Sequence, residues 1–216
     1  LHQSSQKLRS EFHDLKITPI QADFTRQVSL PLTQEKNQSV SDKVDDKRQA
    51  LGFFPGSTIG NFSPSQAIEF LIEARHTLGQ DALMLIGVDT KKKPDILHRA
   101  YNDQEGVTAA FNRNILHHIN TALRANFSPE QFEHYAFYNP VEGRIEMHLI
   151  SKMDQRISVG AQTFTLKQGE SIHTENSHKY TPEEFADLAA EADWQLEQTW
   201  LDEKEMFSVH LMKSVP

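Results

Sequence analysis

Residues 49–90 read QALGFFPGSTIGNFSPSQAIEFLIEARHTLGQDALMLIGVDT, and this stretch decides the fold class. The mostly apolar residues 49–54 predict a buried strand. Residues 64–78 predict a helix, because a serine cap and a first-turn proline precede its apolar stripe. The continuous apolar run 82–88 predicts a second strand covered on both faces, as in a parallel sheet. Strand, helix and strand in this order indicate a βαβ unit and an α/β fold.

Upstream of this stretch, residues 1–15 predict the later half of a helix and 16–22 a short strand. The polar residues 33–47 predict a surface connection. Downstream, residues 91–180 predict two helices and then antiparallel strands. A capped helix from Thr181 and a final hairpin complete the chain. We therefore expect an α/β layer (1–90 and 181–216) interrupted by an α+β insertion at 91–180.

The composition excludes several classes of protein. The chain has 216 residues, no cysteine and a formal net charge of -8. It therefore has no disulfide scaffold, thiolate zinc site or cysteine nucleophile, and it lacks the basic surface that nucleic-acid binding needs. The longest apolar run is too short to span a membrane. We expect a soluble, cytoplasmic protein without a nucleic-acid or membrane partner, and the oligomeric state stays open.

Ligands of open α/β sheets bind at the carboxyl ends of strands, and three segments qualify: 23–25, 56–61 and 88–89. An Asp-Phe pair suits an adenine base, although a solvated aspartate beside a core phenylalanine is the competing interpretation. Residues 56–61, GSTIGN, permit close approach of a ligand to the backbone. No glycine spacing in the chain fits G-x-G-x-x-G or a P-loop.

The eleven histidines do not predict a metal site. His117 and His118 are adjacent on a helix and point apart, and His173 and His178 have no third partner at a convincing spacing. Lys91–Lys93 predicts a solvated turn. Ser171 and Ser177 lie near histidines, but no G-x-S-x-G elbow supports a hydrolase.

Residues 172–177 hold a more informative pair. Strand alternation places Glu175 and Ser177 on the same side of the strand. There a carboxylate and a hydroxyl could both hydrogen-bond to one ring that bears an N–H. An exposed edge strand explains the pattern equally well, and the residues alone leave both interpretations open.

Six blocks, taken together and in order, resemble the histidine Nα-methyltransferase family. The blocks are FFPGSTIGNF (53–62), GVD (87–89), AYND (100–103), GVTAAFN (106–112), RIEM (144–147) and TENSHKYT (174–181). This family uses S-adenosylmethionine to make trimethylhistidine for ergothioneine biosynthesis. The resemblance implies a Rossmann-like class I methyltransferase core with an α+β substrate-binding insertion.

The resemblance also implies where the methyl donor binds. Asp23 and Phe24 would hold the adenine of S-adenosylmethionine. The backbone around Gly56 and Thr58 would line the junction between the donor and the substrate. No metal is implied.

On the substrate side, the resemblance assigns a role to each of five side chains. Asn61 would bind the α-amino group of histidine and Tyr101 its carboxylate. Met147 and Glu175 would shape and read the side-chain pocket, with Ser177 helping Glu175 to hold the imidazole.

The start of the chain departs from the family pattern. The chain begins without methionine, and the family's glycine-rich cofactor loop, its acidic ribose-binding residue and an earlier helical segment have no counterpart here. We therefore expect an incomplete core at the N-terminus and little activity from this chain alone. Two alternatives remain: a related N-methyltransferase acting on another amino acid or small amine, and a non-catalytic binding module.

Overall fold

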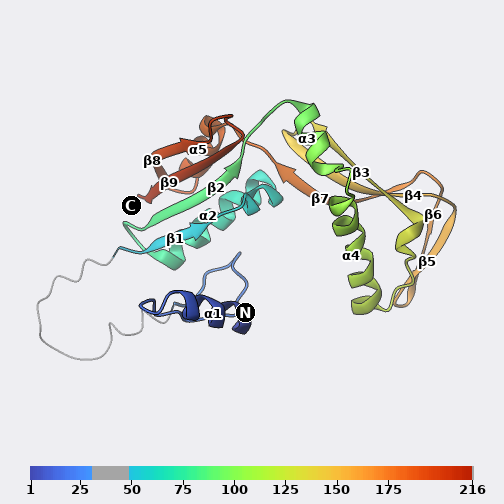
Figure 1. Ribbon diagram of the computed structural model, residues 1–216, viewed down its shortest axis with the longest axis horizontal. Coiled ribbons are helices and arrows are strands. Elements are labelled where there is room, and N and C mark those ends of the chain that lie inside the picture. The colour runs from blue at the N-terminus through green and yellow to red at the C-terminus, as the bar shows by residue number, and fades with distance from the viewer. Residues whose placement is uncertain (31–48, 216) are drawn as a thin grey trace, which may run out of the picture.

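The computed structural model describes residues 1–30 and 49–215 and groups their elements around two main sheets (Figure 1). The first sheet has the strand order β1-β2-β9-β8. β1 and β2 pair in parallel, whereas β9 runs antiparallel to both β2 and β8. The bounds are β1 Leu51–Phe54, β2 Leu83–Asp89, β8 Trp194–Leu201 and β9 Phe207–Ser214.

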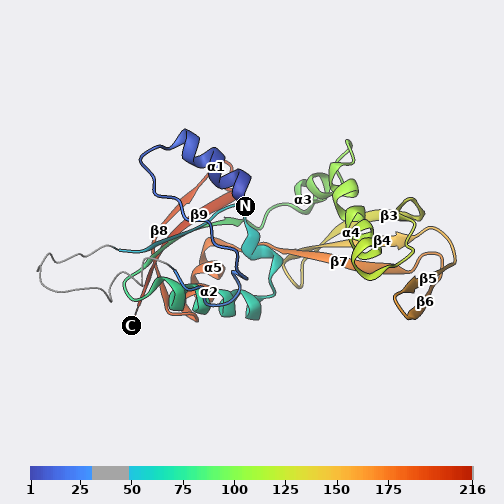
Figure 2. The same cartoon turned by 90° about the horizontal axis from the view of Figure 1, so that it is seen from below.

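Helices α2 (Pro64–Leu78) and α5 (Pro182–Ala190) cover one face of this sheet. Both begin with a capping box, formed by Ser63 with Gln66 and by Thr181 with Glu184, because these residues satisfy backbone N–H groups that the first turn leaves free. Their apolar stripes and the sheet enclose one cluster of buried side chains centred on Leu71, Ile86 and Phe185. Figure 2 shows α1 (His2–Glu11) on the opposite side of the sheet.

The second sheet comes entirely from residues between β2 and α5 and has the order β3-β4-β7. Its strands, all antiparallel to their neighbours, are β3 Phe132–Asn139, β4 Arg144–Ser151 and β7 Ser171–His178. Helices α3 (Pro94–Tyr101) and α4 (Val107–Leu123) pack on one face of it. A small hairpin of β5 (Gln155–Val159) and β6 (Gln162–Leu166) and two short 3-10 helices, η3 (Thr58–Asn61) and η4 (Pro129–Gln131), complete the described elements.

A β-bulge interrupts the pairing of β4 with β7. Met147 lies opposite Glu175, but its neighbour His148 lies opposite His173, so Thr174 is the extra residue. A bulge reverses the alternation of side chains along the bulged strand. Glu175 and His173 therefore point to opposite faces of the sheet, although they are two residues apart.

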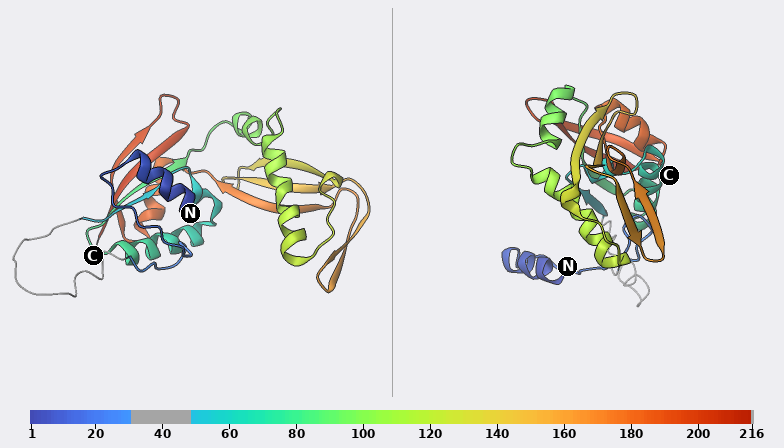
Figure 3. Two further views of the ribbon diagram at one scale, coloured as in Figure 1. Left: turned by 60° about the horizontal axis from the view of Figure 1, so that its bottom comes forward. Right: turned by 90° about the vertical axis from the view of Figure 1, so that its right-hand side faces the viewer.

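The two groups of elements are joined by the segment from β2 to α3 and by the segment from β7 to α5 (Figure 3, left). These segments lie side by side, since Thr90 and Tyr180 form a parallel bridge. The ends of β2 and β7 therefore meet where the groups join.

Several expectations are wrong in detail. Residues 16–22 form no strand: none of the described strands pairs with them, and Pro19 lacks an N–H to donate. The stretch 49–54 is not a buried strand, because β1 lies at the edge of the described sheet with Leu51 and Phe53 exposed. The sheet is mixed rather than wholly parallel. Helix α1 ends at Glu11, and the expected connection at 33–47 lies outside the described residues.

The other expected helices and the C-terminal hairpin are confirmed within about two residues of their expected ends. Among the helices of the described residues, none is both long and apolar enough to cross a bilayer.

Candidate functional site

A pocket of about 370 Å³ lies where the two groups of elements join. It receives side chains from the turn after β1, from the end of β2, from α3 and from the end of β7. The lining residues are Gly56, Ser57, Thr58, Asn61, Asp89, Tyr101, Glu175, Ser177, Lys179 and Phe207. The structure therefore brings together six of the nine residues assigned to the two ligands from different parts of the sequence.

The turn after β1 is fixed to the end of β2. Gly56 and Ser57 both adopt positive φ angles, +77° and +58°, so the chain reverses sharply there. The Ser57 N–H donates to the Gly87 carbonyl at 3.1 Å, and the Ser57 hydroxyl accepts from the Asp89 N–H at 2.9 Å. These bonds hold the backbone of residues 56–58 at one wall of the pocket.

The next glycine lets this wall contact β7. A Cβ atom on Gly60 would lie only 2.7 Å from the His178 carbonyl oxygen. Burial lowers the pKa of His178, while its Nδ1 lies 3.1 Å from the Gly60 carbonyl oxygen. The neutral ring, with Nδ1 protonated, therefore donates to that carbonyl and ties the turn to β7.

A buried lysine organises the centre of the pocket. Lys179 is 1% exposed, and its ammonium nitrogen contacts three oxygens. These are Asp89 Oδ2 at 2.8 Å, the Tyr101 hydroxyl at 2.8 Å and Ser177 Oγ at 2.6 Å. The three acceptors match the three donors of the ammonium group, so the buried charge is both paired and fully hydrogen-bonded.

This arrangement fixes what Ser177 offers to a ligand. Its oxygen accepts from Lys179 at 2.6 Å and from the Tyr101 hydroxyl at 2.9 Å. Within the described part of the chain the hydroxyl hydrogen of Ser177 has no acceptor. Ser177 is therefore available as a donor toward the pocket.

Glu175 is the complementary acceptor. Its side chain is half-buried, and burial raises the pKa of its carboxyl even though the positive charge of Lys179 opposes the rise. No hydrogen-bond donor from residues 1–30 or 49–215 reaches this carboxylate. A half-buried acceptor without a partner is costly, so the carboxylate is suited to an N–H group of a ligand.

Met147 and Asn61 differ in their positions. Met147 is 2% exposed and lies behind the pocket, packed with Leu97 and Ala136 and opposite Glu175 on the neighbouring strand. It does not line the pocket itself. Asn61, at the end of η3, is exposed and does line it.

Asp23 and Phe24 lie apart from this pocket. Asp23 accepts from the backbone N–H and hydroxyl of Thr25, at 3.0 and 2.7 Å, and these bonds lower the pKa of its carboxyl. Phe24 is 53% exposed and packs against Phe54 and Phe70, with centroid distances of 5.9 and 6.2 Å. Because Phe54 ends β1 two residues before Gly56, the Phe24 ring lies on the same end of that strand as the turn.

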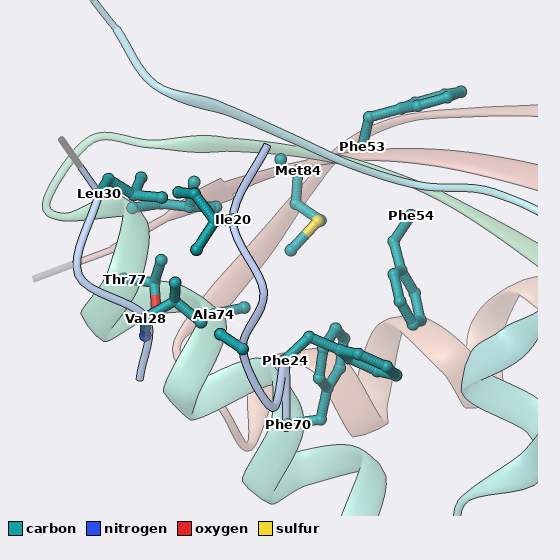
Figure 4. Close-up of a pocket in the computed structure, with 13 residues that line it drawn as sticks. Ile20, Phe24, Val28, Leu30, Phe53, Phe54, Phe70, Ala74, Thr77 and Met84 are labelled. Atoms are coloured by element: carbon teal, nitrogen blue, oxygen red, sulfur yellow. Dashed lines mark hydrogen bonds between the residues drawn. The ribbon is translucent and has the colours of Figure 1, made fainter. Parts of the chain in front are cut away.

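Figure 4 shows these rings at one end of a second, apolar cavity of about 310 Å³. Ile20, Val28 and Leu30 line its other end. Phe53 also borders the cavity, but its ring is directed outward from it. The segment 20–30 therefore lies against β1 and α2 through side-chain contacts and not as a strand.

Sequence reasoning missed Lys179 and assigned Asp89 no partner. Asp89 had a detectable signal, since it follows the buried strand at the carboxyl end of the sheet. Lys179 had none, because a lysine between histidine and tyrosine looks like any exposed residue. The lysine stretch 91–93 is also not simply solvated: Lys92 is largely buried, and its ammonium contacts Asp89 and donates to the Met206 carbonyl at 2.7 Å.

Comparison with known proteins identifies the family of the chain. The family described as "Histidine-specific methyltransferase, SAM-dependent" matches residues 1–214. The histidine N-alpha-methyltransferase of Mycolicibacterium smegmatis is 39% identical over 171 residues, covering 78% of this chain and 53% of that protein. The ergothioneine biosynthesis protein 1 of Neurospora crassa is 29% identical over 171 residues, covering 73% of this chain and 18% of that protein.

A further relative carries a different substrate in its name. The 4-dimethylallyltryptophan N-methyltransferase easF of Arthroderma benhamiae is 29% identical over 183 residues, covering 80% of this chain and 53% of that protein. The chain thus spans about half the length of the bacterial relative described above. With its α/β core and the match over almost its full length, the chain belongs to the S-adenosylmethionine-dependent, histidine-specific methyltransferase family.

Proposed function

We propose that the protein transfers methyl groups from S-adenosylmethionine to the α-amino nitrogen of L-histidine, ending at trimethylhistidine. The observation that carries this proposal is the unpartnered, half-buried carboxylate of Glu175 beside the outward-donating hydroxyl of Ser177. A neutral imidazole has one N–H donor and one nitrogen acceptor. Glu175 and Ser177 offer the matching acceptor and donor.

The amino-acid end of the substrate is assigned to the other side of the pocket. Asn61 would accept a hydrogen bond from the α-amino group. Tyr101 would bind the carboxylate by turning its hydroxyl hydrogen from Ser177 to that group. The positive charge of Lys179, next to the Tyr101 hydroxyl, favours an anionic group there. Met147 would support the imidazole site from behind, through its packing beneath Glu175.

The residues assigned to the methyl donor fit a ligand of that kind. A Cβ on Gly56 would meet no atom within 4 Å, so a ligand can approach the backbone at Gly56 and Thr58. The ionised Asp23 and the exposed side of the Phe24 ring would hold an adenine by hydrogen bonding and stacking. When bound, S-adenosylmethionine supplies an electrophilic methyl group on a sulfonium sulfur.

The chemistry requires positioning above all. The lone pair of the neutral amine forms the new N–C bond as the C–S bond breaks, and the bonding electrons pass to sulfur. Each of the first two transfers must also release a proton from nitrogen before the next can occur. Holding both ends of histidine supplies the alignment that an in-line displacement needs. We also propose that residues 91–180 form the substrate-binding domain.

The test uses the complete product of the gene alongside this chain, with S-adenosylmethionine and histidine, and mass spectrometry of the products. We expect mono-, di- and trimethylhistidine from the complete product. Glu175→Gln should raise the KM for histidine about 10- to 100-fold, the cost of a lost charged hydrogen bond. Because the pKa of Glu175 is raised by folding, its ionised form costs stability at neutral pH, so the substitution should not unfold the protein.

Glu133→Gln, an exposed carboxylate on β3, is the matched control and should leave the KM unchanged. Absence of methylated histidine from the complete product would refute the proposal. Preference for another amine in a panel of amino acids, with histidine unmethylated, would identify the alternative substrate class.

A further inference from the structure

A row of stacked rings crosses the face of the β3-β4-β7 sheet that points away from α3 and α4. Ala136, Ile145 and Met147 pack with Leu97 of α3, so the residues that alternate with them point to the other face. The rings on that face belong to Tyr135, Phe137, His148 and His173, with successive centroid distances of 5.8, 5.5 and 4.6 Å.

The β-bulge puts His173 into this row. Regular alternation from Glu175 would aim His173 at the pocket side of the sheet, but the register places it opposite His148. Glu146 precedes His148 by two residues on β4 and so points to the same face. Two imidazoles and a carboxylate therefore meet on adjacent strands.

The carboxylate of Glu146 has one oxygen already committed and one available. Its Oε1 accepts from Asn139 at 3.0 Å and contacts Arg144 at 2.9 Å. Its Oε2 lies 3.4 Å from His148 Nε2, which is long for a hydrogen bond to a charged group. Burial acts to raise the pKa of Glu146, but these hydrogen bonds outweigh it and the pKa is lowered, so the group is anionic at neutral pH.

The same 3.4 Å fits a metal centre. Two ligands at about 2.1 Å from a tetrahedral ion lie about 3.4 Å apart. Ligand atoms of Glu146, His148 and His173 all lie within 4.8 Å of one another. The rings of the two histidines are nearly parallel, at 13°, so one must turn for both nitrogens to face an ion. His173 is the exposed member, and turning it would exchange the 3.2 Å contact of its Nε2 with the Glu175 carbonyl oxygen for the ion.

We propose that Glu146, His148 and His173 bind a divalent ion of the zinc class, with water completing the coordination. Two imidazoles and a carboxylate are ligands that Zn²⁺ accepts, whereas Mg²⁺ and Ca²⁺ prefer sets of oxygen atoms. The guanidinium of Arg144 opposes the ion's charge but also keeps Glu146 oriented. The sequence predicted no metal because His173 lacked a third partner, and the bulge supplies two.

The site would join β4 to β7 at the bulge that also aims Glu175 at the substrate pocket. An ion there ties together the two strands whose register positions Glu175. Because it binds only the folded arrangement, the ion should also raise the melting temperature of the protein.

The experiment is calorimetric titration of Zn²⁺ into the untagged, metal-free chain, with Mg²⁺ titrated in parallel. We expect one Zn²⁺ per chain, no comparable Mg²⁺ binding, and a higher melting temperature with Zn²⁺. His173→Ala should weaken Zn²⁺ binding at least about tenfold, since it removes one of three protein ligands. His148→Phe should do the same while keeping a ring in the stacked row, which separates lost ligation from lost packing.

His117→Ala is the matched control, because His117 is an exposed histidine on α4 outside this face. It should leave the affinity and stoichiometry unchanged. The proposal is overturned if Zn²⁺ does not bind, if both site variants bind it as well as the unaltered chain, or if His117→Ala weakens binding equally.

Discussion

The two sheets of this protein are stabilised in different ways. The first sheet packs against α2 and α5 through one large apolar cluster, which includes Leu71, Ile86 and Phe185. The second sheet has two smaller clusters and relies in addition on polar side chains at its bulge, among them the buried Asn112 and the half-buried Thr174. Apolar packing tolerates small shifts, whereas hydrogen bonds fix directions. The sheet that carries Glu175 and Ser177, which we propose to contact the substrate, is the one whose bulge is held by these hydrogen bonds.

The strongest test of this comparison is Lys179, where the two sheets meet. Lys179→Met leaves the hydroxyls of Tyr101 and Ser177 without their buried cation. It also leaves Asp89 with one lysine partner, Lys92, in place of two. We expect the free energy of unfolding, measured by urea denaturation, to fall by about 3–5 kcal/mol.

Lys213→Met is the matched control, because Lys213 pairs with Asp81 at the surface, at 3.2 Å. It should cost about 1 kcal/mol or less. Equal losses in the two variants would mean that the buried network contributes no more than a surface ion pair.

Lowering the pH should reduce the free energy of unfolding because His210 is buried in the first sheet. Burial lowers the pKa of this ring to about 4, and its partners are the hydroxyls of Thr199 and Ser208. Between pH 6.5 and 4 the unfolded chain binds a proton that the folded one does not, so stability falls as the pH falls. The expected loss is up to about 3 kcal/mol.

Urea denaturation at pH 7, 6 and 5 measures this slope. His210→Gln should flatten it, while His117→Gln, at an exposed position, should leave it unchanged. A slope that is the same in His210→Gln as in the unaltered protein would contradict the assignment.

The bulge of the second sheet depends on Asn112 of α4. Its amide nitrogen lies 2.9 Å from His134 Nδ1 and donates to the His148 carbonyl at 3.1 Å, and its oxygen accepts from the Thr174 hydroxyl at 2.6 Å. Asn112→Ala should lower the free energy of unfolding by about 1–3 kcal/mol. It should also weaken histidine binding, because Glu175 follows the bulge directly.

Asn114→Ala on the same helix provides the control for this position. Asn114 is exposed and should change stability by no more than about 0.5 kcal/mol. If Asn112→Ala lowers stability but leaves histidine affinity intact, the bulge does not set the position of Glu175.

Phe24 should show the smallest effect on stability. Its ring is 53% exposed, so Phe24→Ala should cost only about 1 kcal/mol. Loss of base stacking should nevertheless weaken S-adenosylmethionine binding about 5- to 100-fold, measured by calorimetry on the complete gene product. Phe53→Ala, whose ring points away on the other side of β1, should leave that affinity unchanged (Figure 4).

The elements that could be predicted from the sequence are those with local signals. Ser63 and Thr181 predict the starts of α2 and α5. In each case the cap residue, the proline that follows it and the capping-box partner lie within four consecutive residues. The pairing of Glu175 with Ser177 on one side was also predictable from alternation, and the register confirms it. The expected strand at 16–22 failed because a strand requires a partner, which a single segment does not reveal.

Sequence by itself determined four of the five helices, the βαβ unit, the C-terminal hairpin and the family, since caps, periodicity and ordered motifs are properties of neighbouring residues. Tertiary structure decided the rest. It placed Lys179 against Asp89, although 90 positions separate them, and it turned His173 toward His148 through a single extra residue in β7. Buried charges and bulges depend on what lies across a sheet or a pocket, and that information appears only when distant segments meet.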